Sequence, residues 1–208
     1  MYCIITRKKL IAGFCGLLAC IVLVCGASWL RSVGATADAE LGIRLPIIMY
    51  HSILKDASRT GKYVITPSRV EEDLIYLQEN GYETVVVADL IAYVTDGTPL
   101  PEKPVMITLD DGYLNNLTYM LPLLEQYDMR AVISVIGLYS ELYSETPDPN
   151  PAYAPLTWDD IKTLSESGRV EIQNHSYNMH KQETRRGASR RSGESMEVYA
   201  KALSDDVT

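Results

Sequence analysis

Short apolar runs alternate along the chain with longer segments of helical periodicity. The runs that predict buried strands cover residues 45–49, 83–87, 105–109, 131–136 and 170–173. Strands and helices that alternate in this way predict βα units and a mostly parallel sheet or barrel. The expected fold class is therefore α/β.

The expected helices have recognisable ends. The first begins at a capping box formed by Ser68 and Glu71, and Gly81 stands where it should stop. Further helices are expected over residues 89–94, over residues 113–127 with a kink or break at Pro122, and between Thr157 and Gly168. The polar or proline-rich residues 54–66 and 144–155 are expected to form loops.

The first 30 residues are set apart by their hydrophobicity. Three basic residues at positions 7–9 precede residues 10–30, a run of 21 residues without a charge, which is close to the ~20 residues that a helix needs to cross a bilayer. The basic flank predicts a cytoplasmic N-terminus and an extracytoplasmic remainder. The small residues 35–37 resemble a signal-peptide cleavage site, so secretion after cleavage is the alternative to a membrane anchor.

Composition and charge restrict which partners and which metal ligands this chain can use. The 19 basic and 27 acidic residues give a net charge of -8, which disfavours nucleic acid because phosphate binding needs a basic surface. All four cysteines lie within the first 25 residues, so a metal site elsewhere must use histidine and carboxylate ligands. The 14 tyrosines would suit sugar rings where they are exposed, although most tyrosines are simply half-buried.

Reactive side chains follow three of the predicted strands. His51 follows the first run, Asp110 and Asp111 follow the third, and His175 follows the fifth, with His180 close behind. In βα architectures the carboxyl ends of the strands converge on one rim, where function is located. All three histidines of the chain fall at these positions, which makes the rim the candidate site.

Each of these residues also has a structural interpretation. An acidic pair after a strand can cap the next helix, and a single histidine is more often a hydrogen-bonded structural group than a ligand. His175 and His180 are five residues apart, which does not place both rings on one helical face, although they can chelate from a loop. Two histidines and one carboxylate are nevertheless a standard ligand set of catalytic zinc, with one position left open for water.

Two motifs resemble those of the NodB-homology polysaccharide deacetylases, carbohydrate esterase family 4. The segment Thr108 to Tyr113 (TLDDGY) is similar to the family's Thr-Phe-Asp-Asp-Gly-Tyr signature, with Leu109 in place of Phe. The segment His175 to His180 (HSYNMH) is similar to the second signature, and its spacing is similar to that of the poly-N-acetylglucosamine deacetylase branch. The segment Met49 to Ser52 (MYHS) resembles the opening of the domain in exported members of that branch.

The resemblance implies a role for each matched residue. Asp111, His175 and His180 would hold a divalent metal, commonly zinc. Asp110 would be the general base that takes a proton from water, whose pKa such a metal lowers towards ~7 while it polarises the acetyl carbonyl. His51 and Tyr113 would contact the substrate or support the metal ligands.

The apolar N-terminal run and the resemblance together predict a domain organisation. We expect a membrane anchor over residues 1–30, a linker over 31–44 and a deacetylase domain over 45–208 with the fold of a distorted (β/α) barrel. The family's later Arg-Pro-Tyr and Leu-His motifs have no match in this sequence. We therefore expect a barrel that is incomplete at its C-terminus, in which metal binding survives more readily than catalysis.

The predicted function is metal-dependent hydrolysis of N-acetyl groups on an extracellular N-acetylglucosamine polymer, either peptidoglycan or an exopolysaccharide. One alternative is an esterase that removes O-acetyl groups from xylan-like glycans with the same metal site. The other is a non-catalytic surface protein that binds glycan. The sequence leaves open which polymer and which metal are used, and the oligomeric state.

Overall fold

The computed structural model describes residues 42–180 and 187–207. The predicted membrane anchor over residues 1–30 and most of the predicted linker lie outside the described residues. Within the described ranges, no helix has both the length and the apolar character needed to cross a bilayer. The unit that begins at Leu45 contains every helix and strand of these ranges.

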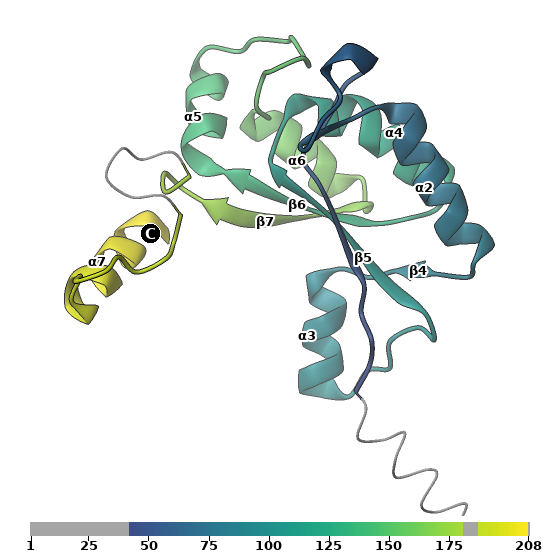
Figure 1. Cartoon of the computed structure of the whole chain (residues 1–208), viewed down its shortest axis with the longest axis horizontal. Helices are drawn as coiled ribbons and strands as arrows, with labels where there is room; N and C mark the ends of the chain where they lie inside the picture. Colours follow the sequence, from purple (N-terminus) through teal and green to yellow (C-terminus); the bar gives the residue numbers. More distant parts are fainter. Residues whose placement is uncertain (1–41, 181–186, 208) are drawn as a thin grey trace, which may run out of the picture. The chain divides into compact units, whose positions relative to one another are not determined.

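A five-stranded parallel sheet forms the centre of this unit (Figure 1). Its strands are β1 (Ile47–Tyr50), β4 (Glu83–Thr84), β5 (Pro104–Asp111), β6 (Ala131–Ile136) and β7 (Val170–Ser176). β5 lies between β1 and β6, β7 pairs with β6, and β4 pairs with the first two residues of β5. Because all pairs are parallel, the carboxyl ends of the strands share one edge of the sheet.

Helices fill most connections between the strands. They are α2 (Pro67–Glu79), α3 (Val87–Asp96), the π-helix η2 (Asn116–Met120), α4 (Leu121–Gln126), α5 (Gly137–Glu145), α6 (Trp158–Glu166) and α7 (Met196–Val207). A short parallel pair, β2 (Ser52–Ile53) and β3 (Val64–Ile65), is joined by the 3-10 turn η1 (Ala57–Arg59). The predicted α/β class is confirmed, and among the described strands the sheet is open, with β1 and β7 at its edges.

The main core lies between one face of the sheet and three helical segments. Ile107 and Leu109 of β5 are fully buried on this face, where α2, η2 with α4, and α6 cover them. Each buried side chain of this size contributes roughly 2 kcal/mol through the removal of apolar surface from water. On the opposite face, α3 packs against Met106 and Val132. The alternation of side chains along β5 thus supplies two separate apolar clusters.

The boundary between β4 and α3 differs from the sequence prediction. The run of β-branched residues over 83–87 predicts a strand, yet β4 has two residues and α3 begins at Val87. The Asp89 carboxylate accepts a hydrogen bond from the Val86 N–H at 2.9 Å and forms an ion pair with Arg130 at 2.6 Å. These contacts start the helix early, and Arg130 lies too far along the chain for local periodicity to reveal them.

A proline and a glycine lie at the starts of two further helices, α4 and α5. Pro122 lies in the first turn of α4, directly after the wider turn of the π-helix η2. The chain stays helical over residues 114–126, so Pro122 does not break the helix, and the irregularity beside it is the π-helical turn. α5 had no predicted counterpart because it begins at Gly137, a poor helix former. A Cβ at position 137 would lie 2.8 Å from the Tyr177 ring, so close packing favours glycine there.

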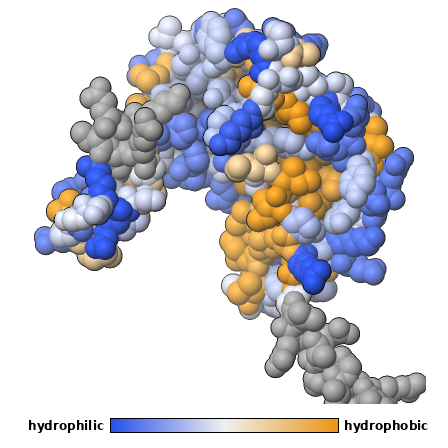
Figure 2. Space-filling view, viewed as in Figure 1, coloured by the Kyte–Doolittle hydropathy of each residue, from blue (hydrophilic) through white to orange (hydrophobic). Residues whose placement is uncertain are grey.

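Exposed apolar side chains gather on the α3 side of the sheet (Figure 2). Ile47 and Met49 of β1 are 60% and 59% exposed, and they pair in register with Met106 and Thr108 of β5. On α3, Ile91 is also exposed. This face of β1 is therefore uncovered within the described residues.

Candidate metal centre

The predicted site residues lie together at the carboxyl edge of the sheet. Asp110 and Asp111 end β5, His175 lies at the end of β7, and His51 directly follows β1. In the strand register, Asp111 is level with Val135 of β6, which in turn is level with Asn174 of β7. Asp111 and His175 thus reach the same level of the rim across the intervening strand.

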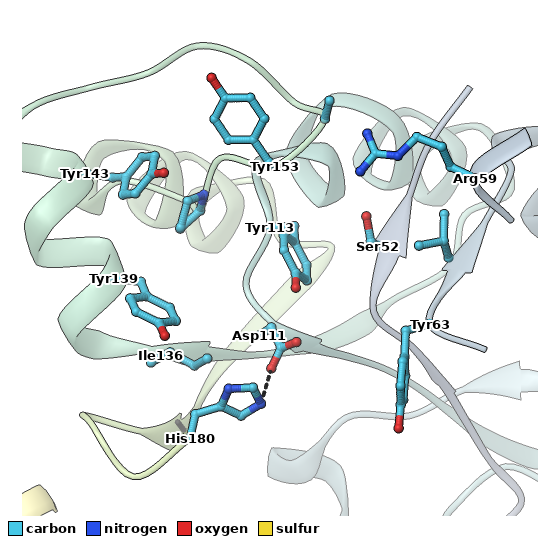
Figure 3. Close-up of a pocket in the computed structure, with 13 residues that line it drawn as sticks. Ser52, Arg59, Tyr63, Asp111, Tyr113, Ile136, Tyr139, Tyr143, Tyr153 and His180 are labelled. Carbon is cyan, nitrogen blue, oxygen red and sulfur yellow. Dashed lines mark ion pairs between the residues drawn. The ribbon is translucent and has the colours of Figure 1, made fainter. Parts of the chain in front are cut away.

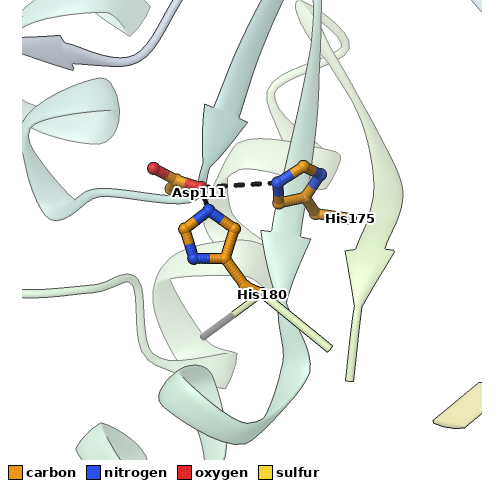
Figure 4. Close-up of side chains that lie close together, drawn as sticks. All are labelled: Asp111, His175 and His180. Atoms are coloured by element: carbon orange, nitrogen blue, oxygen red, sulfur yellow. Dashed lines mark ion pairs between the residues drawn. The ribbon is translucent and has the colours of Figure 1, made fainter. Parts of the chain in front are cut away.

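Asp111, His175 and His180 converge on one point (Figure 4). The Nε2 atom of His180 lies 3.1 Å from Oδ1 of Asp111, and the Nε2 atom of His175 lies 3.5 Å from the same oxygen. One potential ligand atom from each residue lies within 4.8 Å of the other two. The structure therefore brings the three predicted metal ligands together.

The hydrogen bonding of this cluster fits a bound cation. Oδ1 of Asp111 is buried and accepts no hydrogen bond, despite the two imidazole nitrogens nearby, and Nδ1 of His180 is also without a partner in the described part of the chain. A buried polar atom without a partner is costly, and a cation among these lone pairs would remove that cost for the carboxylate. Two imidazoles and one carboxylate suit a divalent ion such as zinc.

Two backbone irregularities aim these side chains. Asp111 and Gly112 both have left-handed conformations, with φ of 72° and 69°, and a residue other than glycine is uncommon there. Between β6 and β7, Val135 of β6 pairs with Asn174 of β7, and Ile136 of β6 pairs with Ser176 of β7. His175 of β7 therefore has no opposite residue in β6. A bulge of this kind redirects a side chain. Strict strand alternation is therefore interrupted both at Asp111 and at His175.

We expect Gly112→Ala to destabilise the domain more than a matched glycine substitution. A Cβ at Gly112 would lie 2.9 Å from Cγ1 and 3.2 Å from Cα of Val135. Gly168 has the same left-handed φ, 70°, but open space around it. Urea denaturation should show a loss of about 1–2 kcal/mol for Gly168→Ala and about 1–3 kcal/mol more for Gly112→Ala. Equal losses would show that the close approach to Val135 is unimportant.

Asp110 and His51 form a second pair on the rim. The Nε2 atom of His51 lies 4.0 Å from Oδ2 of Asp110, which is beyond hydrogen-bond distance. The His51 ring also packs against the Tyr63 ring, with their centroids 4.8 Å apart. The side chains of His51 and Asp110 are 16% and 21% exposed. His51 thus lies beside Asp110 rather than within the cluster of Asp111, His175 and His180.

Two buried asparagines join the loops that carry these residues. Asn116 donates a hydrogen bond to the His51 carbonyl at 2.9 Å and accepts one from the Tyr113 N–H at 3.1 Å. Asn115 accepts from the Ile53 N–H at 2.9 Å. Both are fully buried, and a satisfied buried network of this kind fixes one arrangement. Sequence reasoning missed them, although two consecutive polar residues in an otherwise apolar helix were the available signal.

A cavity of about 400 Å³ opens beside Asp111 and His180 (Figure 3). Five tyrosines line it, namely Tyr63, Tyr113, Tyr139, Tyr143 and Tyr153. Burial, together with the nearby Asp111 carboxylate, raises the pKa of Tyr113 above its ordinary value, so its hydroxyl stays protonated at neutral pH. Of these tyrosines, sequence reasoning singled out Tyr113 alone. The high tyrosine content was the only sign of the others.

Comparison with known proteins identifies the family. The family described as Polysaccharide deacetylase matches residues 97–204, just over half of the 208-residue chain. The chain belongs to the polysaccharide deacetylase family. The family match contains all three clustered residues, and the resemblance seen in the Asp-Asp-Gly and His-Ser motifs is confirmed.

Other polysaccharide deacetylases share both sequence and fold with this chain. The poly-β-1,6-N-acetyl-D-glucosamine N-deacetylase of Escherichia coli (strain K12) is 29% identical over 142 residues, which are 64% of this chain and 20% of that protein. YxkH of Bacillus subtilis (strain 168) is 37% identical over 104 residues, which are 50% of this chain and 36% of that protein. The chain thus spans only about a fifth and a third of the lengths of these two relatives.

A solved structure shows the same fold. The de-N-acetylase from Aggregatibacter actinomycetemcomitans superposes with a TM-score of 0.64 and 25% sequence identity. The match covers 79% of this chain and 71% of that one. The fold of this chain is therefore that of the NodB-type deacetylases.

Proposed function

We propose that this member of the family removes acetyl groups from N-acetylglucosamine units of an extracellular polysaccharide, with the help of a divalent metal ion for which zinc is our candidate. The observation that carries the proposal is the convergence of Asp111, His175 and His180 on a buried oxygen that accepts no hydrogen bond. The name of the Escherichia coli relative, an N-deacetylase of poly-β-1,6-N-acetyl-D-glucosamine, supports an N-acetylated substrate.

We assign the metal to Asp111, His175 and His180. When bound, a divalent cation supplies Lewis acidity, which polarises an acetyl carbonyl and makes water a stronger acid. The cluster borders the tyrosine-lined cavity through Asp111 and His180. A sugar in this cavity would therefore lie next to the cluster, with tyrosine rings against its apolar faces and hydroxyls free for hydrogen bonds.

Asp110 is the general base in this proposal. Its carboxylate lies outside the three-residue cluster, yet it adjoins Asp111 in the sequence and is partly exposed on the same rim. A carboxylate that is not itself a ligand keeps its lone pairs available to accept a proton from the attacking water. Water attack on the acetyl carbon then requires a second proton transfer, because the departing nitrogen must be protonated.

His51 is our candidate for that second transfer. Of the chain's three histidines, it is the one that lies outside the three-residue cluster. Imidazole changes charge between pH 5 and 8, which suits a group that donates a proton to an amine at neutral pH. The hydrogen bond from Asn116 to the His51 carbonyl and the packing against Tyr63 hold the residue at the rim.

We also propose that residues 1–30 anchor the protein in the membrane and that the deacetylase domain lies outside the cell. The uncharged run over residues 10–30 and its basic flank support this location. Signal cleavage, which would release the domain, is the alternative that N-terminal sequencing of the mature protein distinguishes.

Acetate release tests the proposed activity. We expect the full-length protein to release acetate from chitooligosaccharides or β-1,6-linked N-acetylglucosamine oligomers, to lose this activity after chelation, and to regain it with added zinc. Release from acetylated xylan but not from the N-acetylated oligomers would instead indicate an O-acetyl esterase. Metal binding without acetate release from any glycan would contradict the enzymatic proposal and indicate a glycan-binding protein.

A further inference from the structure

The tyrosine-lined cavity contains a permanent positive charge. Arg59 of η1 lines the same cavity as Asp111 and His180, and Figure 3 shows its guanidinium group directed into the cavity near Ser52. Among the described residues that line this space, Arg59 is the only lysine or arginine. A guanidinium group stays charged at every physiological pH.

Arg59 forms no ion pair with a carboxylate of the described residues. In the described ranges, the arginines in ion pairs are Arg69, Arg130 and Arg169. The nearest acidic residue in sequence, Asp56, accepts hydrogen bonds from the backbone N–H and hydroxyl of Ser58 at 3.0 and 2.6 Å. These hydrogen bonds lower the pKa of Asp56, and Arg59 adds only a smaller, through-space contribution. The turn that carries Arg59 is thus held by its own hydrogen bonds, and the guanidinium donors are left for a ligand.

The chain as a whole would repel an anionic polymer, because its net charge is -8. The loop that contains η1 is instead positively charged. It carries three basic residues, Lys55, Arg59 and Lys62, and one acidic residue, Asp56. The two lysine ammonium groups lie over tyrosine rings, 5.1 Å from the centroid of Tyr119 and 4.8 Å from that of Tyr63, and neither lysine lines the cavity. Positive charge within the cavity therefore comes from Arg59.

We infer that Arg59 makes the tyrosine-lined cavity selective for glycans that carry an anionic group, a carboxylate or a phosphate, on a sugar near the acetylated one. The inference rests on the proposed function and narrows its substrate class. The planar guanidinium group binds carboxylate and phosphate through two parallel hydrogen bonds. A sugar held against the tyrosines, with its acetyl group at the metal cluster, would bring a charged substituent of a neighbouring unit to Arg59.

Binding to a catalytically silent protein tests the selectivity without relying on turnover. The full-length, zinc-loaded Asp110→Asn protein is titrated by calorimetry with three oligosaccharides of equal length. One is a neutral N-acetylglucosamine oligomer, one carries a lactyl carboxylate on alternate sugars, and one carries a sugar phosphate. We expect at least one anionic oligomer to bind about three- to tenfold more tightly than the neutral one, and the tighter of the two identifies the group.

Substitutions in the same loop locate the effect. In the Asp110→Asn protein, the further substitution Arg59→Gln should abolish the preference for the anionic oligomer. Arg59→Lys should keep only part of the preference, because an ammonium group cannot form the two parallel hydrogen bonds of a guanidinium group. Lys55→Gln removes the same charge from the same loop outside the cavity, so it should keep the preference. An unchanged preference in Arg59→Gln, or an equal loss in Lys55→Gln, would overturn the inference.

The inference and the proposed function can fail separately. A parent protein that prefers anionic glycans but releases no acetate would contradict the enzymatic proposal alone. A protein that releases acetate and binds neutral and anionic oligomers equally would contradict the assignment of Arg59 alone.

Discussion

His175→Ala is expected to lower the affinity for zinc by more than about 100-fold and to abolish metal-dependent acetate release. The substitution leaves Oδ1 of Asp111 with a single imidazole nitrogen nearby, that of His180 at 3.1 Å. Two ligands hold a divalent ion far less tightly than three. Competition with a chromophoric chelator measures the affinity. The melting temperature without metal should change little, because His175 is one-third exposed and has no opposite residue in β6.

His51→Ala is the matched control for this experiment. It removes another imidazole from the same rim, but one that lies 4.0 Å from Asp110 and outside the three-residue cluster. We expect it to keep the parental zinc affinity. Parental affinity in His175→Ala, or an equal loss in both variants, would show that the cluster is not the metal site.

Asp110→Asn is expected to retain zinc and to lower the rate of acetate release by about 10²- to 10⁴-fold, the usual contribution of a general base. The amide keeps the size of the side chain but cannot take a proton from water. Asp110 is not among the three residues whose ligand atoms converge, so its charge is not required to hold the ion. Zinc affinity and acetate release, measured on the same preparation, separate the two roles.

A second carboxylate distinguishes loss of the base from loss of general negative charge. Asp96 is exposed at the end of α3, at the edge of the sheet opposite the rim. Asp96→Asn should therefore leave both zinc affinity and acetate release unchanged. If Asp110→Asn released acetate at the parental rate, Asp110 would not be the base. If it lost zinc as His175→Ala does, it would be a ligand instead.

The strands show where sequence patterns are sufficient. Residues 131–136 were predicted as a strand and form β6 with the same bounds, because an apolar run that is buried on both faces is distinct in the sequence. β5 extends past its predicted end to include Asp110 and Asp111. Its polar end faces the rim, where solvent and ligands replace apolar contacts, so hydrophobicity did not mark it as strand.

In the candidate site too, the sequence predicts some residues and not others. The positions of His51, Asp111 and His175 at strand ends follow from the order of strands and helices, and the two motifs with Asp-Asp-Gly and His-Ser indicated the family. Arg59 and four of the five cavity tyrosines were not identified individually. They come from separate loops and helices, and which of them share a cavity depends on how those segments pack.

The sequence alone determined the α/β class, because local periodicity is a property of neighbouring residues. Its two motifs, through their resemblance to a known family, indicated the family and the three residues that cluster around one oxygen. Tertiary structure alone decided the bulge at His175, the fit of Gly112 against Val135 and the meeting of Arg59 with the tyrosines. Those features arise from pairing and packing between segments far apart in the chain, and the energy of such contacts leaves no periodic trace in the residues that make them.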